Sequence, residues 1–414
     1  MRLEAIRTKW LGLTWWERIA VAVWTVILLV VCIRVSISPR SHSVFPIFST
    51  AGLHWRLGQE LYYPYFFDPQ LDIFRYSPLA AALLAPWSAF SDRAGSVIWR
   101  LFNAAFYLVA LLWWARAVLP ICLNRSQLAL LTLLAVPLSI GCLNNGQTNV
   151  LLIGLLLGGT AAIHTGRWNL AAGCMALAVL FKVYPLALAL LIALVHPRKF
   201  GLRFGVALVL GLGLPFLLQD PGYVARQYAH WWDLLWADNR HERPVSDLCS
   251  RDLWLIIRLL HFPISFAGYR CLQLLLAVGV ATICLAGRLT GWSQHRLLTK
   301  LFSLGVCWMV LCGPATESCT YILLAPVLAW AVLDAMLDRR PLWSRMIPWC
   351  SFALFGLSQF TSWVPESFRM LFIGILPAAG VLLLLSLVET SVREMMKSFS
   401  ISPVRSEFPL AKAA

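Results

Sequence analysis

The sequence alternates between long apolar runs and short polar segments, the pattern of a chain that crosses a membrane repeatedly. A helix needs about 20 apolar residues to span the hydrocarbon core, and somewhat fewer where neighbouring helices bury it. The pattern predicts an all-α, polytopic integral membrane protein with about twelve transmembrane helices, near Arg18–Ile37, Gly95–Ala115, Gln127–Cys142, Asn149–His164, Asn169–Phe181, Tyr184–Val195, Leu202–Leu218, Ser265–Ala286, Leu297–Cys312, Ser318–Met336, Met346–Phe360 and Phe368–Val388.

Composition agrees with this pattern and excludes other classes of protein. Hydrophobic residues make up 60% of the 414 residues and charged residues 13%, whereas soluble domains are roughly 45–50% apolar and about 25% charged. A soluble globular protein, a collagen, a disordered chain and a small disulfide scaffold are therefore excluded. The 11 cysteines contain no C-x-x-C pair, so we expect neither a metal site nor a redox cofactor.

Basic residues indicate the orientation in the membrane. The formal net charge is +15, but Lys and Arg fall between apolar runs and not in aromatic-rich basic blocks, so nucleic acid is not an expected partner. The positive-inside rule places the basic loops and both termini in the cytoplasm. A crossing at Tyr76–Phe90, which contains Pro78 and Pro86, would invert every later loop. We therefore expect that run to form a helix in the outer interface of the cytoplasmic membrane.

Two outer segments, residues 38–93 and 219–263, are much longer than ordinary connections between helices. We interpret residues 1–414 as one transmembrane domain and these two segments as candidate walls of a binding site. With the short outer turns they hold twelve of the 19 acidic residues, and the two segments alone carry nine arginines. Solvated surface charge and a site for an anionic ligand both account for this enrichment.

Two polar motifs at the predicted outer depth suit sugar and phosphate recognition. In residues 74–78, Phe-Arg-Tyr-Ser-Pro, Arg75 lies at the mouth of the expected interfacial helix. Residues 144–149, Asn-Asn-Gly-Gln-Thr-Asn, join two spans, and their amides and hydroxyl both donate and accept hydrogen bonds, as sugar hydroxyls require. The alternative is a capping turn, with Thr148 or Asn149 as the N-cap of the following helix.

Two further motifs place charge at the same depth. Lys182 interrupts the apolar stretch Ala171–Val195, and a lysine in a membrane is costly unless it is paired, hydrated or functional. Its ammonium suits a phosphate, and the alternative is snorkelling to the interface. Glu317 belongs to the short outer turn Gly313–Ser318 between two long apolar runs. It is either a carboxyl adjusted for acid–base chemistry or a hydrated helix cap.

The order of these motifs resembles glycosyltransferase family 87. The resemblance rests on residues 51–62 (AGLHWRLGQELY), 74–79 (FRYSPL), 145–149 (NGQTN) and 182–185 (KVYP). It implies the GT-C membrane fold with interfacial helices in the first outer loop. It also implies a polyprenyl-phosphate sugar donor, an acceptor at the extracytoplasmic face, and neither a nucleotide sugar nor an obligatory metal.

The chain departs from that family at two positions that the resemblance would assign to the site. Family members begin the first outer loop with an acidic residue, whereas this chain has Ser41-His42-Ser43 there. Family mannosyltransferases place a histidine in the late outer turn, whereas this chain has Glu317, Cys319 and Thr320.

Together these observations predict inverting transfer of a glycosyl group, with mannose as the first candidate, from a polyprenyl-phosphate carrier to a glycan or glycolipid acceptor, among membrane lipids. The first candidate base is Glu317, and the alternates are His42, Asp72 and Asp252. The candidate phosphate ligands are Lys182, Arg75, Arg251 and Tyr184, and the candidate sugar ligands are Asn144, Asn145, Gln147, Asn149 and Tyr76. A lipid-linked sugar flippase or another non-catalytic carrier is the main alternative, and a purely structural membrane subunit is the second.

Overall fold

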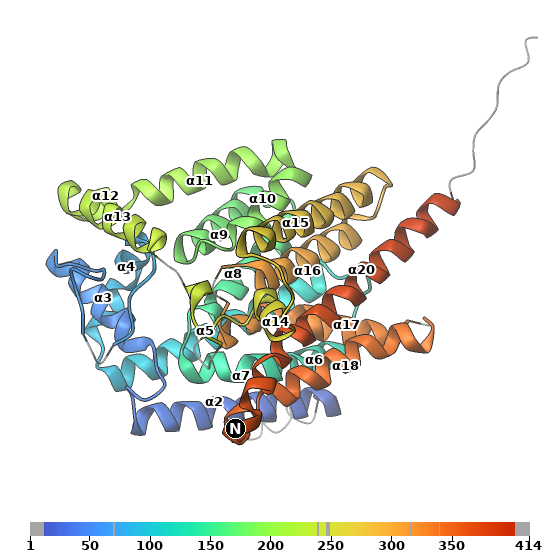
Figure 1. The fold of residues 1–414 in the computed structure, drawn as a ribbon, viewed down its shortest axis with the longest axis horizontal. Coiled ribbons are helices and arrows are strands. Elements are labelled where there is room, and N and C mark those ends of the chain that lie inside the picture. The colour runs from blue at the N-terminus through green and yellow to red at the C-terminus, as the bar shows by residue number, and fades with distance from the viewer. Residues whose placement is uncertain are drawn as a thin grey trace, which may run out of the picture.

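The computed structural model describes residues 12–401 except 69–70, 238–239, 246–248, 315 and 339. Within these residues the chain is built from helices and contains no strand (Figure 1). The all-α, polytopic fold is therefore confirmed. The ends of the chain, residues 1–11 and 402–414, lie outside the described part, so their predicted cytoplasmic location stays a prediction.

Among the described residues, seven helices are long and apolar enough to cross a membrane. Four of them are single helices: α2 (Trp15–Ile37), α5 (Asp92–Ala117), α15 (Phe266–Leu289) and α16 (Gln294–Cys312). The span Pro197–Leu218 contains α11 (Leu202–Gly213) and α12 (Pro215–Leu218), and the span Ser318–Leu337 contains the 3₁₀ helix η4 (Ser318–Leu324) and α17 (Ala325–Leu337). The last span, Ile375–Lys397, lies within α20 (Ile375–Ile401). Helices α6 (Arg125–Leu134) and α7 (Val136–Asn145), which meet at a bend of 54°, make an eighth span if they are counted as one.

The predicted count of twelve crossings is not confirmed, because several apolar helices are short. The helices α8 (Asn149–His164), α9 (Trp168–Phe181) and α10 (Leu186–Val195) have 16, 14 and 10 residues. At a rise of 1.5 Å per residue, even the longest of them covers roughly 24 Å of a hydrocarbon core about 30 Å thick. The predicted interfacial run is also helical, as α4 (Pro78–Leu84) and a 3₁₀ turn at Ala85–Ala89.

The core of the bundle surrounds α8, which packs between α5 and α9. Nearly all of α8 is buried, whereas few residues of α2, α11 and α15 are buried. Exposed leucine and valine side chains on the peripheral helices suit contact with lipid, whose tails are as apolar as these side chains. The remaining helix of the C-terminal half, α18 (Leu342–Ser358), packs against α17 and α20.

The two long outer segments meet at one end of the bundle. Figure 1 shows α3 (Phe45–Leu57), α4, α12 and α13 (Pro221–Trp236) gathered at its left edge. The fully buried Gln227 of α13 accepts a hydrogen bond from the backbone N–H of Leu61 (3.1 Å) and donates one to Glu60 (2.7 Å). Tyr223 of α13 donates to the carbonyl of Gln59 (2.7 Å). These contacts join residues from both segments into one layer.

Candidate functional site

Lys182 lies where the chain breaks between α9 and α10. It ends α9 in an extended conformation, and Pro185 begins the next helix. Its Nζ donates to Oδ1 of Asn149 (2.8 Å) and lies 5.6 Å from the ring centre of Tyr76 and 6.0 Å from that of Tyr184. The ammonium is thus bound inside the protein by an amide and by aromatic faces, which attract cations. These contacts replace the snorkelling interpretation.

Asn149 connects Lys182 to the polar turn at residues 144–149. Its side chain is fully buried, and its Oδ1 accepts a second hydrogen bond from the Tyr184 hydroxyl (3.0 Å). Its Nδ2 is buried and has no hydrogen-bond partner among the described residues. A buried amide donor without a partner is costly, so this atom is suited to a ligand oxygen.

The turn is not explained by capping through Thr148. Thr148 occupies the N-cap position of α8, but it makes no side-chain capping bond. Its hydroxyl instead donates to the Tyr76 hydroxyl (3.1 Å), so the residue links the first outer segment to α8.

A buried arginine in α5, which the sequence analysis missed, holds the turn in place. The side chain of Arg100 donates to the carbonyls of Leu143 (3.1 Å) and Asn144 (2.7 Å), at the end of α7. Gly146 follows with a left-handed φ of 73°, and a Cβ there would lie 3.0 Å from the guanidinium carbon of Arg100. Trp99 donates to the Gly146 carbonyl (2.8 Å). The signal in the sequence was a charged residue inside an apolar run, the same signal that identified Lys182.

The other amides of the turn divide into two groups. Asn144 is occupied, because its Oδ1 accepts a hydrogen bond from Arg34 (2.9 Å). The carbonyl of Asn145 accepts from the backbone of Val44 (3.0 Å). By contrast, Oδ1 of Asn145 and Oε1 of Gln147 are buried without a hydrogen-bond partner in the described part of the chain. Asn145, Gln147 and Asn149 therefore each keep an atom for a ligand, whereas Asn144 has a structural contact.

Glu317 approaches this cluster from the start of η4. Its backbone N–H donates to the Thr320 hydroxyl (3.2 Å), and its side chain is exposed. The carboxylate lies within electrostatic range of the Lys182 ammonium and near the neutral Tyr184 hydroxyl. The helices α7 and α8 both pack against η4, and Cys142 of α7 lies near Cys319 of η4. The structure therefore brings the predicted base, lysine, tyrosines and amides together.

A cavity of about 430 Å³ adjoins the cluster. This volume is within the range of about 300–1,000 Å³ that is usual for small-molecule sites. Its wall includes Cys142 and Cys319, and it also includes Arg251, Gln359 and Arg369. Arg251 thus lies on the cavity, as part of a wall that α7, η4 and the C-terminal helices build.

Asp252 follows Arg251 and caps α14 (Leu253–Leu259). Its carboxylate accepts a hydrogen bond from the backbone N–H of Leu255 (3.2 Å) and is buried. Burial penalises the charged form and raises the pKa of Asp252 from 3.8 to about 6. The residue thus titrates near neutrality while it holds the start of a helix.

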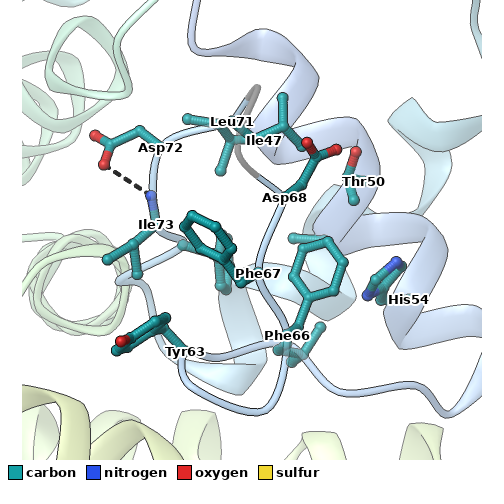
Figure 2. A pocket seen from close by; sticks show the side chains of 13 residues that line it. Ile47, Thr50, His54, Tyr63, Phe66, Phe67, Asp68, Leu71, Asp72 and Ile73 are labelled. Atoms are coloured by element: carbon teal, nitrogen blue, oxygen red, sulfur yellow. Dashed lines mark hydrogen bonds between the residues drawn. The ribbon is translucent and has the colours of Figure 1, made fainter.

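The remaining candidates lie in the first outer segment. His42 is exposed, with a left-handed φ of 50°. Arg75 forms an ion pair with Asp72 (3.2 Å) and donates to the carbonyl of Ile73 (3.2 Å). Figure 2 shows the Asp72 carboxylate directed at the N–H of Ile73, beside a pocket lined by Phe66 and other aromatic rings. That pocket measures about 20 Å³, enough for one water molecule but not for a sugar.

The chain was compared with family models, with curated protein sequences and with solved structures. The model of glycosyltransferase family 87 matches residues 74–314. A comparison with curated protein sequences finds no match. Among solved structures, the crystal structure of ArnT from Cupriavidus metallidurans bound to undecaprenyl phosphate is similar, with 12% sequence identity and a TM-score of 0.39 over 89% of this chain and 78% of ArnT.

Proposed function

The chain belongs to glycosyltransferase family 87, and we propose that it transfers a sugar, with mannose as the first candidate, from a polyprenyl-phosphate carrier. The acceptor is the hydroxyl of a glycan or glycolipid at the extracytoplasmic membrane surface. The observation that supports this proposal best is the setting of Lys182. Its hydrogen-bond acceptor in the described structure is the neutral amide of Asn149, and a carboxylate, Glu317, lies within electrostatic range.

Lys182 is the group we assign to the leaving phosphate. A cation whose contacting partners are neutral keeps its charge for an incoming anion. Stabilising the charge that develops on a leaving group is a large term in catalysis when the site excludes water. The Tyr184 hydroxyl shares Asn149 with Lys182 and is positioned to donate to the same phosphate.

Glu317 is the base in this proposal. The acceptor oxygen forms a bond to the anomeric carbon of the sugar while the bond from that carbon to the phosphate oxygen breaks. The electron pair leaves with the phosphate, and the acceptor proton passes to the Glu317 carboxylate. One displacement inverts the anomeric configuration. Asn149 Nδ2 and Gln147 Oε1 provide the buried donor and acceptor that would orient the sugar hydroxyls.

The other predicted ligands have different parts in this proposal. Arg251 lines the cavity, and the next residue, Asp252, acts as the helix cap of α14. Arg75 and Asp72 neutralise one another in the first outer segment, so we assign both to the shape of that loop. His42 is exposed and stays an alternate base for an acceptor entering from that side.

Transfer by the purified protein tests the proposal. Labelled polyprenyl-phosphate mannose and, in parallel, the arabinofuranose donor are incubated with the protein and a membrane lipid extract. Label in a new lipid or glycan product supports the transferase. Movement of intact labelled carrier across proteoliposome membranes without a new product favours the flippase alternative. If the protein shows neither transfer nor movement of the carrier, the structural-subunit alternative is favoured.

The side of the membrane needs its own measurement. In a chain whose exposed cysteines Cys122, Cys271 and Cys350 are replaced by serine, single cysteines are introduced at Glu366 and at Arg198, both exposed. An impermeant maleimide should label Glu366→Cys in intact cells and label Arg198→Cys only after permeabilisation. The reverse pattern would place the site in the cytoplasm.

A further inference from the structure

Two cysteines meet in the wall of the cavity beside the Lys182 cluster. Cys142 lies near the end of α7, and Cys319 lies in η4. Helix α7 packs against η4, and among the described residues these are the two cysteines that line the cavity. Their side chains lie near one another, and both are free thiols in this structure. The fold therefore brings together a pair of thiols that no C-x-x-C motif predicted.

The setting of this pair is typical of reactive thiols. Cys319 is partly exposed, whereas Cys142 is buried, and both line the cavity of about 430 Å³. The ammonium of Lys182 lies within electrostatic range of both side chains. Reactive cysteines are typically partly exposed and beside a cation, whereas structural cysteines are buried and inert. Cys319 therefore has the surroundings of a reactive thiol, and Cys142 is its neighbour.

Each cysteine is also attached to a part of the proposed site. The backbone carbonyl of Cys142 accepts hydrogen bonds from the N–H groups of Gly146 (3.0 Å) and Gln147 (3.2 Å), so it helps to hold the polar turn. Glu317 is the N-cap of η4, in which Cys319 is the second residue. A bond between the two sulfurs would therefore connect the segment of the proposed base to the segment of the proposed sugar ligands.

We propose that Cys142 and Cys319 form a reversible disulfide that switches transfer off. The inference rests on the proposed function, which places this end of the bundle at the extracytoplasmic surface, where disulfides form and persist. Bonded sulfurs lie about 2.0 Å apart, closer than non-bonded sulfurs approach one another. The disulfide would therefore draw η4 toward α7 and displace Glu317. A displacement of about 1 Å in a catalytic group lowers a rate by about 10²-fold.

The oxidant in this proposal is a disulfide of low molecular weight, such as oxidised glutathione. The thiolate of Cys319, the more exposed of the pair, attacks one sulfur of the oxidant, forms a mixed disulfide and releases one small thiolate. The thiolate of Cys142 then attacks the Cys319 sulfur and releases the second small thiolate. The two protons lost by the cysteines pass to the two small thiolates. The cysteine pair is oxidised by two electrons, and the oxidant is reduced by two.

Peptide mapping by mass spectrometry tests the disulfide without measuring transfer. The full-length chain, with the exposed Cys122, Cys271 and Cys350 replaced by serine, is equilibrated in detergent with mixtures of reduced and oxidised glutathione. The remaining thiols are then alkylated. Oxidation should produce a cross-link between the peptides of Cys142 and Cys319, and dithiothreitol should reverse it. Alkylation of both thiols throughout the series, or a disulfide to another cysteine, would overturn the inference.

The rate of label transfer tests the switch. Oxidation should lower the rate about tenfold or more, and dithiothreitol should restore it. Cys142→Ser and Cys319→Ser each remove one sulfur, so each variant should transfer at the same rate in both redox states. The matched control is Cys174→Ser, which changes a half-buried cysteine of α9 outside the cavity wall and should stay sensitive to oxidation. A cross-linked protein that transfers at the reduced rate would contradict the switch.

The outcomes separate this inference from the proposed function. If the reduced protein transfers label but the cross-link does not form, the inference fails and the proposed function stands. If neither redox state transfers label, the proposed function fails, and the peptide map still decides whether the disulfide forms. Hydrogen exchange then measures its effect on the site, because a cross-link between η4 and α7 should slow the local opening of η4. Equal exchange of η4 in both redox states would overturn the coupling.

Discussion

Two lysines lie among apolar helices in different electrostatic settings, Lys182 at the end of α9 and Lys300 within α16. Lys182 donates to the neutral amide of Asn149 (2.8 Å). Lys300 donates to the Thr390 hydroxyl (2.6 Å) and lies 3.8 Å from a carboxylate oxygen of Glu394. Both ammonium groups have lost most of their contact with water, so their partners decide what each one does.

Lys300 belongs to a network of ion pairs that joins α16, α17 and α20. Arg340 pairs with Asp334 (2.7 Å) and Asp338 (2.9 Å), Arg296 pairs with Glu394 (3.4 Å), and Arg393 pairs with Glu389. Each cation in this network faces a carboxylate, so the charges cancel and the network holds helices together. Lys182 instead donates to a neutral amide, and in the proposed function its charge stabilises the donor phosphate. The comparison teaches that the partner, more than the buried charge itself, distinguishes a site from a structural clamp.

Replacing Glu317 should have the largest effect. Glu317→Gln keeps the size of the side chain but removes the proposed base, so transfer should fall by about 10²–10⁴-fold. The protein level should not change, because the side chain is exposed. Rates of label transfer by purified protein check this, with Glu366→Gln, another exposed acid of an outer turn, as the control. A wild-type rate in Glu317→Gln would remove this residue from the mechanism.

Lys182→Gln should lower the rate of the chemical step by about 10²–10³-fold, the effect of losing one group that stabilises developing charge. Lys182→Arg keeps the charge and should retain more activity. The comparison of kcat with KM for the two variants is the measurement. If both variants change KM alone, Lys182 only binds the donor and does not assist departure of the phosphate.

Arg340→Met tests whether the network of ion pairs around Lys300 is structural. The change leaves Asp334, whose side chain is 35% exposed, without its cation. It should lower the free energy of unfolding by about 2 kcal/mol, less than for a fully buried pair because water screens part of the charge. The folded fraction should keep its specific activity. Unfolding in detergent measures the loss of stability, and transfer rates measure the specific activity of the folded protein. A stable but inactive Arg340→Met protein would contradict the division between clamp and site.

Asp252 should make stability depend on pH. Its pKa in the folded protein, about 6, is above its ordinary value of 3.8, so the folded state holds the proton more tightly. Its contribution to stability is therefore complete below about pH 4 and is lost as the pH rises through 6. Asp252→Asn keeps the cap and removes the titration. In thermal unfolding, the variant should gain stability relative to the wild type as the pH rises from 4 to 7. A difference in stability that does not change with pH would refute the raised pKa of Asp252.

Tyr76→Phe should have the smallest effect. The ring remains beside Lys182, but the Thr148 hydroxyl loses its acceptor. We expect a loss of about 1 kcal/mol in the free energy of unfolding, the usual value for one hydrogen bond. Thr148→Val, measured with Tyr76→Phe in a double-mutant cycle, isolates the pair. Additive losses would show that the two hydroxyls do not interact.

The sequence predicted part of the site because intramembrane polar residues are rare and each one stands out. Lys182 was identified in this way, whereas Asn149 and Glu317 were identified as polar residues of short turns between apolar runs, and the structure places the three together. The same rule applied to α5 would have identified Arg100, which holds the turn in place and is not among the described residues that line the cavity. It could not show that Asp72 and Arg75 neutralise one another. An ion pair depends on where two side chains point and not on their depth.

The sequence by itself determined the all-α polytopic architecture and the family. Both follow from local features, the length of apolar runs and the order of short motifs, which are visible without any contact between distant residues. Only the tertiary structure decided that Arg251 and Arg369, over a hundred residues apart, share one cavity, and that α8 to α10 are short helices inside the bundle. Those outcomes depend on how helices pack, because burial and hydrogen-bond partners are set by neighbours in space and not by neighbours along the chain.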